Sequence, residues 1–203
     1  MSSHPKSPSA SSSLAARLEQ EGEVSVADCY PCGKCTAGCP AAEDMDVAPS
    51  QVLRLLQTET PKHEERALKS LAIWMCIGCE TCVTRCPQEV DLPRAMDYLR
   101  KESVERDLVH PEGRDVIAFH RSFMSAVEKF GRLFEFGMIV EYKLRTGHLM
   151  QDVLSAPVMF AKGKVPILPH KAKGAAAIAR IFERVRKAEA ETAHAAGHAG
   201  EGR

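Results

Sequence analysis

Eight cysteines in this chain of 203 residues fall into two groups with identical spacing, and none lies outside them. They are Cys29, Cys32, Cys35 and Cys39, followed by Cys76, Cys79, Cys82 and Cys86. A proline follows the last cysteine of each group, as Pro40 and Pro87. Disulfide frameworks spread cysteines through small secreted chains, whereas these crowd into two short windows. The pattern therefore favours metal binding.

Each window has the Cys-x2-Cys-x2-Cys-x3-Cys-Pro spacing and resembles the run of bacterial two-cluster ferredoxins, in which the fourth cysteine binds the other cluster. Gly33 and Gly78 permit the loops to wrap tightly. The proline biases the fourth cysteine away from the α region and directs its sulfur towards the neighbouring cluster. We therefore predict two [4Fe-4S] clusters as cofactors. The expected ligands are Cys29, Cys32, Cys35 and Cys86 for one cluster, and Cys76, Cys79, Cys82 and Cys39 for the other.

Structural zinc is the alternative metal, because it also accepts four thiolates. Zinc ribbons, however, join two separated Cys-x-x-Cys pairs, whereas each window here holds three closely spaced thiols and a closing Cys-Pro. Iron–sulfur clusters fit this arrangement better. A purely structural role for the clusters is the weaker hypothesis, since two cross-ligated clusters close together resemble an electron relay.

The pattern of apolar residues is helical throughout, and no β-alternation is found. Between the cysteine windows, the sequence predicts one helix from Pro49 towards Thr60 and a second through Ala67 to Met75. After Pro87, Asp91 is expected to cap a helix with Pro93 in its first turn. The fold class is therefore mainly α.

Apolar residues recur at helical spacing downstream as well, over 116–130, 133–144 and 178–185, with a proline-punctuated connector over 155–173. The first residues are rich in Ser and Pro, and the last are Ala, His, Gly and Glu, so neither end offers apolar surface to bury. We expect four regions. They are a disordered tail at 1–13, a cluster-binding domain at 14–110, a helical partner-docking extension at 111–188 and a disordered tail at 189–203.

Helices between the cysteine windows distinguish this chain from ordinary bacterial ferredoxins, where strands connect them. It resembles the α-helical ferredoxin domain of iron–sulfur subunits such as those of succinate dehydrogenase, glycolate oxidase and heterodisulfide reductase. The stretch Arg114 to Tyr142, followed by the basic segment Gly163 to Gly174, looks like the C subunit of heterodisulfide reductase. The resemblance covers roughly residues 25–185.

This resemblance implies an electron-transfer subunit without catalytic residues of its own. It carries electrons between a flavin-containing subunit and a cysteine-rich catalytic subunit that reduces a disulfide. The chain has no cysteines left for the clusters of such a catalytic subunit and no glycine-rich dinucleotide fingerprint. The alternatives are the iron–sulfur subunit of another dehydrogenase, acting on a hydroxy acid or succinate, and a zinc-stabilised interaction module.

Charge excludes little, since 27 Lys and Arg balance 27 Asp and Glu. The basic stretch from Lys162 to Lys187 lacks the interleaved aromatics of single-strand binding, so nucleic acid is not an expected partner. No apolar run approaches the length of a membrane span, and no secretory signal is seen at the start. We expect a cytoplasmic location.

Overall fold

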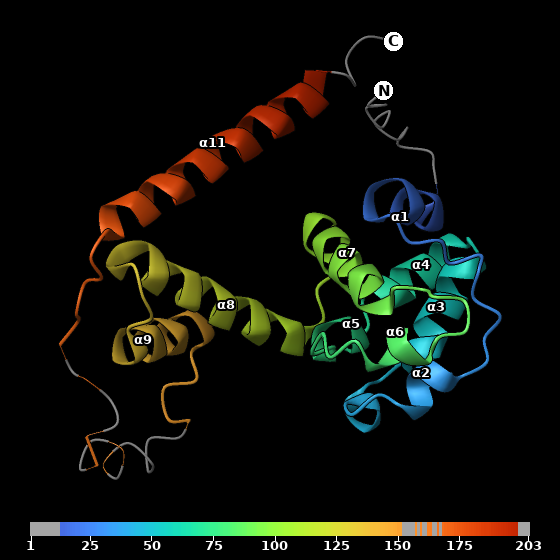
Figure 1. Cartoon of the computed structure of the whole chain (residues 1–203), viewed down its shortest axis with the longest axis horizontal. Coiled ribbons are helices and arrows are strands. Elements are labelled where there is room, and N and C mark those ends of the chain that lie inside the picture. The colour runs from blue at the N-terminus through green and yellow to red at the C-terminus, as the bar shows by residue number, and fades with distance from the viewer. Residues whose placement is uncertain are drawn as a thin grey trace. The chain divides into compact units, whose positions relative to one another are not determined.

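The structure is a computed structural model, and helices account for all of its regular structure in the described residues, which confirms the mainly α class. The described residues are 13–151, 157, 159, 162–163, 166 and 168–198. The chain divides into two compact units, residues 1–114 and 115–203 (Figure 1). Each unit is described by itself.

The first unit contains short helices followed by one long one. They are α1 (Leu14–Gly22), α2 (Lys34–Ala37), the 3-10 helix η1 (Ala42–Asp44), α3 (Pro49–Gln57), α4 (Pro61–Leu68), α5 (Ala72–Met75), α6 (Thr81–Arg85) and α7 (Leu92–Glu105). The unit ends in the first turn of α8 (Pro111–Phe130). As predicted, Asp91 caps α7, with its carboxylate accepting the Arg94 N–H at 3.1 Å.

The core of this unit forms where α7 packs against α1, α4 and α5, and α3 against α4. Leucines from four of these helices are fully buried there, and they are Leu14, Leu18, Leu56, Leu68 and Leu99. Burying each such side chain contributes about 1.5–3 kcal/mol. This packing holds the segments that carry the two cysteine groups in one unit.

The single helix predicted just before the second cysteine group is two helices. α4 ends at Leu68 and α5 begins at Ala72. The Ser70 hydroxyl donates to the Ala67 carbonyl at 2.9 Å, and the Ala72 N–H donates to Asp46 Oδ1 at 2.9 Å. These side chains take over hydrogen bonds that a continuous helix would make, so the chain turns here although the apolar spacing continues.

A buried carboxylate joins the first helix to the last one of the core. Glu102 on α7 is 3 % exposed, and its Oε2 lies 2.7 Å from Arg17 Nη2 on α1 and 2.8 Å from Arg106 Nη2. The Tyr98 hydroxyl donates to the other oxygen at 3.2 Å. Burial raises the pKa of Glu102, although the Arg17 guanidinium opposes the shift. The two arginines are therefore needed to keep this carboxylate charged inside the core.

The second unit contains the rest of α8, then α9 (Glu135–Thr146) and α11 (Ala175–His198), in agreement with the helical spacing of these segments. Glu141 on α9 accepts from Ser125 on α8 at 3.0 Å. Gly131 follows the end of α8 with φ +71°, and a Cβ there would lie 2.9 Å from the Ala175 Cα. A glycine is therefore required at this close approach.

The expected disordered tail at 189–203 needs correction. Residues 189–198 form the last turns of α11, because Ala and Glu have high intrinsic helix propensity even where they bury nothing. Residues 199–203, residues 1–12 of the other predicted tail and most of the predicted connector at 155–173 lie outside the described residues. Of the helices that the structure describes, none has both the length and the apolar character to cross a membrane.

We predict that Arg17→Met destabilises the first unit by about 1–3 kcal/mol, because it leaves the buried Glu102 with one arginine fewer. Arg94→Met is the matched control, since its ion pair with Glu23 is exposed and such pairs contribute at most about 1 kcal/mol. The measurement is the chemical denaturation midpoint of both variants under anaerobic conditions. Equal midpoints for the two variants would contradict the assignment.

Candidate iron–sulfur cluster sites

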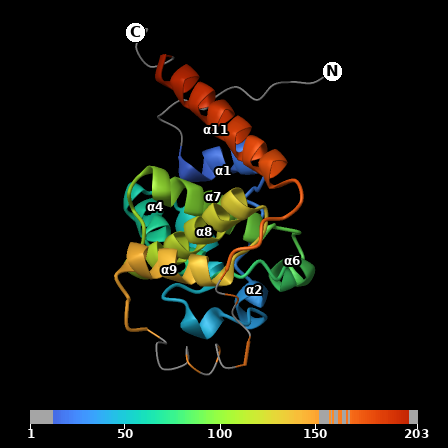
Figure 2. The same cartoon turned by 90° about the vertical axis from the view of Figure 1, so that its left-hand side faces the viewer.

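Two short helices bring the middle of each cysteine group together. Cys35 lies on α2 and Cys82 on α6, and these two helices contact each other (Figures 1 and 2). Both helices begin after a left-handed residue, Gly33 with φ +76° and Glu80 with φ +58°, which directly follows the second cysteine of its group. The two loops therefore share a backbone turn as well as a spacing, although only one of them uses glycine there.

The first of two small pockets lies between the first cysteine group and the end of the second. The cysteines that line it are Cys29, Cys32, Cys35, Cys82 and Cys86. Apolar side chains from outside the groups, Leu53, Val90 and Leu92, complete the wall. The structure thus brings Cys86 to the three cysteines with which the sequence pairs it.

The second pocket is nearly the same size, with empty volumes of ≈ 370 Å³ here and ≈ 350 Å³ in the first. The cysteines that line it are Cys35, Cys39, Cys76, Cys79 and Cys82. Here Cys39 joins the three cysteines with which the sequence pairs it. Cys35 and Cys82 line both pockets, so the two sites are neighbours with a common wall.

Exposure differs among the cysteines in the same way in both groups. Cys32 and Cys79, the second member of each group, are exposed, and the other six are partly buried. Burial raises the pKa of Cys29, of Cys35 and, to about 11, of Cys82. Hydrogen bonding with Thr81 lowers the pKa of Cys79. Because iron binds thiolates, loading these sites would displace protons from the buried thiols.

Hydrogen bonds from nearby backbone and side chains position the fourth cysteine of one group and the helix of the other. The Val90 N–H donates to Cys86 Sγ at 3.4 Å. The Thr36 hydroxyl on α2 donates to Ser50 Oγ at 2.8 Å and accepts from the Ser50 N–H at 3.0 Å. These contacts attach the cysteine loops to the helices that surround them.

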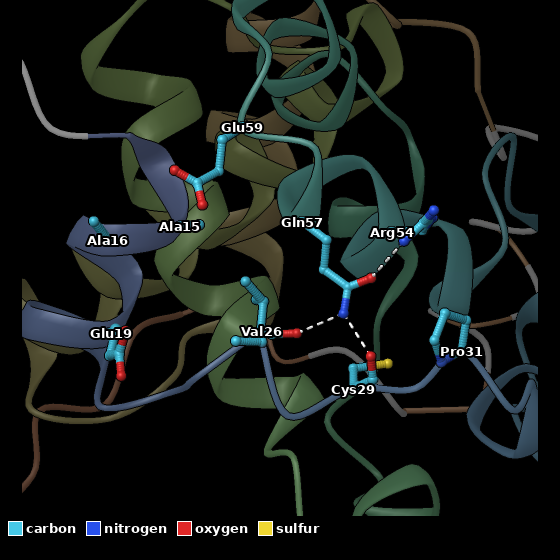
Figure 3. Close-up of a pocket in the computed structure, with 10 residues that line it drawn as sticks. Ala15, Ala16, Glu19, Val26, Cys29, Pro31, Arg54, Gln57 and Glu59 are labelled. Atoms are coloured by element: carbon cyan, nitrogen blue, oxygen red, sulfur yellow. Dashed lines mark hydrogen bonds between the residues drawn. The ribbon is translucent and has the colours of Figure 1, made fainter.

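Two further side chains, which the sequence analysis does not identify, hold the loops that enter the cysteine groups. Gln57 at the end of α3 donates its amide Nε2 to the carbonyls of Val26 and Cys29, at 2.8 and 2.5 Å (Figure 3). Arg100 on α7 donates to the carbonyls of Ile73, at 2.5 Å from Nε, and Cys76. No local signal marks either residue, because each acts on a segment far away in the sequence.

Gln57 also forms part of an open groove beside the first cysteine group. The groove has a volume of ≈ 390 Å³, and its wall comprises residues of α1, of the loop through Cys29 and of the end of α3. Glu19, Arg54 and Glu59 give it a charged rim (Figure 3). Cys29 is the one cysteine in its lining, so the groove lacks the thiols that a cluster needs.

The residues present fit two [4Fe-4S] clusters. Each pocket offers the four expected thiols and a largely apolar lining, which limits access by water. In the described part of the chain, no three His, Cys, Asp or Glu side chains converge as a site for one metal ion would need. Thiols that surround a four-iron cube stand further apart than ligands of a single ion, so this spacing favours clusters over zinc.

Comparison with known proteins bears on the same segment. Residues 25–90 match the sequence model of a 4Fe-4S dicluster domain. The region is similar to the C subunit of heterodisulfide reductase. This confirms the resemblance expected from the sequence, and the number of clusters predicted agrees with a dicluster domain.

Three relatives illustrate the similarity. The C subunit of the ferredoxin:CoB-CoM heterodisulfide reductase of Methanosarcina mazei is 30 % identical over 46 % of this chain and 55 % of its own length. The iron–sulfur C subunit of the CoB–CoM heterodisulfide reductase of Methanopyrus kandleri is 32 % identical over 50 % of this chain and 52 % of its own. An iron–sulfur C subunit of the enzyme of that name from Methanocaldococcus jannaschii is 32 % identical over 53 % and 52 %. The chain spans little more than half the length of these curated relatives.

We predict that protein reconstituted anaerobically contains about eight irons and about eight acid-labile sulfides per chain, as two four-iron clusters require. The measurement is metal and sulfide analysis of the purified, desalted protein. Stoichiometric zinc without sulfide would instead support the structural zinc site.

Proposed function

We propose that this chain is the electron-transfer subunit of a heterodisulfide reductase-like complex, relaying single electrons through two [4Fe-4S] clusters. One observation carries the proposal: two cavities, each beside three cysteines of one group and the fourth of the other, share a wall formed by Cys35 and Cys82. A purely structural metal would need one such site. Two adjoining sites support a relay.

The chain's own residues would hold the cofactors and shield them. Cys29, Cys32, Cys35 and Cys86 would bind one cluster, and Cys76, Cys79, Cys82 and Cys39 the other. When bound, each cluster supplies a centre that gains and loses one electron. The apolar walls keep water from the thiolates on the inner side, while Cys32 and Cys79 stay at the surface.

Exposed apolar side chains at equivalent positions support a separate contact for each site. Tyr30 follows the first cysteine of its group and is 55 % exposed, and Ile77 does so in the other group and is 70 % exposed. A partner that covered either side chain would come close to the exposed cysteine next to it. We infer that electrons enter beside one group and leave beside the other.

The second unit offers further apolar surface, and we propose that it docks a partner protein of the complex. Its large side chains Phe119, Phe123, Met124 and Leu144 are exposed by 37–72 %. The proposed neighbours are a flavin-containing subunit and a cysteine-rich, disulfide-reducing catalytic subunit, in a cytoplasmic assembly. The names of the relatives support disulfide chemistry, since they refer to the CoB-CoM heterodisulfide.

We predict that Cys86→Ser damages the cluster held by the first cysteine group, because Cys86 lines the pocket of that group. Cys39→Ser is the matched variant and should damage the cluster held by the second group. The measurement is iron content together with the EPR signals of the reduced variants. Each variant should retain about half the iron of the wild type, because one of two equal clusters is lost.

The two variants must also complement each other. The EPR signal that survives in Cys86→Ser is expected to be the one lost in Cys39→Ser. Assignment of each fourth cysteine to its own group would be supported instead if Cys86→Ser lost the same cluster as Cys79→Ser.

We predict that the native complex, purified through an affinity tag on this chain, contains a flavin-binding subunit and a second, cysteine-rich subunit. The measurement is mass spectrometry of the complex combined with flavin fluorescence after denaturation. A complex whose catalytic subunit oxidises a hydroxy acid or succinate would show that the chain serves another dehydrogenase.

A further inference from the structure

The loops that lead into the two cysteine groups are held in equivalent ways. Gln57 bridges the carbonyls of Val26 and Cys29, and Arg100 bridges those of Ile73 and Cys76. In each case the second carbonyl belongs to the first cysteine of the group, and the first carbonyl belongs to the residue three positions before it. The two donors come from different helices, α3 and α7, so this equivalence is not a product of repeated sequence.

The two donors differ in charge. The Gln57 amide is neutral, whereas the Arg100 guanidinium carries a permanent positive charge. The Arg100 side chain is 25 % exposed, and it lies on the protein side of the loop because it reaches the backbone from α7. A charge placed there acts through protein, where it is screened less than a charge in solvent.

Other charges near the two sites lie towards solvent. Arg100 itself pairs at 2.8 Å with Asp97, whose side chain is 72 % exposed. Lys34 lines the first pocket and the exposed Glu80 the second, and the exposed Arg54 donates to the oxygen of the Gln57 amide at 3.3 Å. Because solvent and salt screen these rim charges more strongly, Arg100 is the charge with the most direct effect on the second site.

We propose that Gln57 and Arg100 are equivalent positioning residues, one for each cysteine group, and that the cation of Arg100 raises the reduction potential of the cluster at Cys76. Reduction adds negative charge to a cluster, and a nearby positive charge favours that step. Gln57 positions its loop in the same way without adding a charge. This inference rests on the proposed binding of two clusters.

The test compares two substitutions of Arg100 by EPR-monitored redox titration of the loaded protein. Arg100→Gln keeps a hydrogen-bond donor and removes the charge, which reproduces the chemistry of Gln57. It is expected to change the ratio of oxidised to reduced second-group cluster roughly three- to tenfold at a fixed applied potential. That corresponds to a fall of about 28–59 mV for a one-electron couple. The potential of the first-group cluster should stay unchanged.

Arg100→Lys separates charge from positioning, because it keeps the charge and loses the planar fork. Its second-group potential should stay close to that of the wild type. Arg94→Gln, which replaces an exposed arginine on the same helix, is the control and should shift neither cluster. The serine variants Cys86→Ser and Cys39→Ser assign each signal to its site.

Three results would overturn the inference: no shift in Arg100→Gln, equal shifts of both clusters, or equal shifts in Arg100→Lys and Arg100→Gln. If Arg100→Gln failed to retain its clusters, a second-group potential in Arg100→Lys more than about 28 mV below the wild type would equally contradict it. Failure of the proposed function has a different signature, since the wild-type chain would then bind no clusters at all.

Discussion

The fold depends on one constraint: two cysteine loops separated by 36 residues of chain must meet at the contact between α2 and α6. Each pocket needs a cysteine from the other loop, so neither proposed site is complete alone. The packing of α7 on α1, α4 and α5 gives the intervening chain a fixed path. Cluster binding and folding of this unit should therefore be strongly coupled, since a loaded site crosslinks distant segments.

The two loops are near copies in spacing, in backbone turn and in the support of their first cysteine, yet they differ in the charge of that support. Such a difference suits a relay between unlike partners, because two identical sites would give no preference for where an electron resides. Environment, more than ligand identity, sets the potential of a cluster. The arrangement lets the chain adjust one site without altering its cysteines.

Local rules predict much of this architecture. The spacing of the cysteines and their closing prolines indicates the pairing of Cys86 and Cys39 with the opposite groups, and Asp91 with Pro93 predicts the start of α7. The break between α4 and α5 could not be predicted, because it depends on Asp46, which is remote in sequence. The same applies to Gln57 and Arg100, whose partners are loops far along the chain. The final turns of α11 were missed because helix propensity, not burial, maintains them.

The central claim is that both clusters sit in adjoining cavities with Cys35 and Cys82 between them. The most direct measurement is the EPR spectrum of the fully reduced protein, compared with the spectra of samples in which one cluster is reduced. The account predicts magnetic interaction between the two reduced clusters, visible as splitting and broadening absent from the half-reduced samples. A fully reduced spectrum equal to the sum of two independent clusters would contradict it.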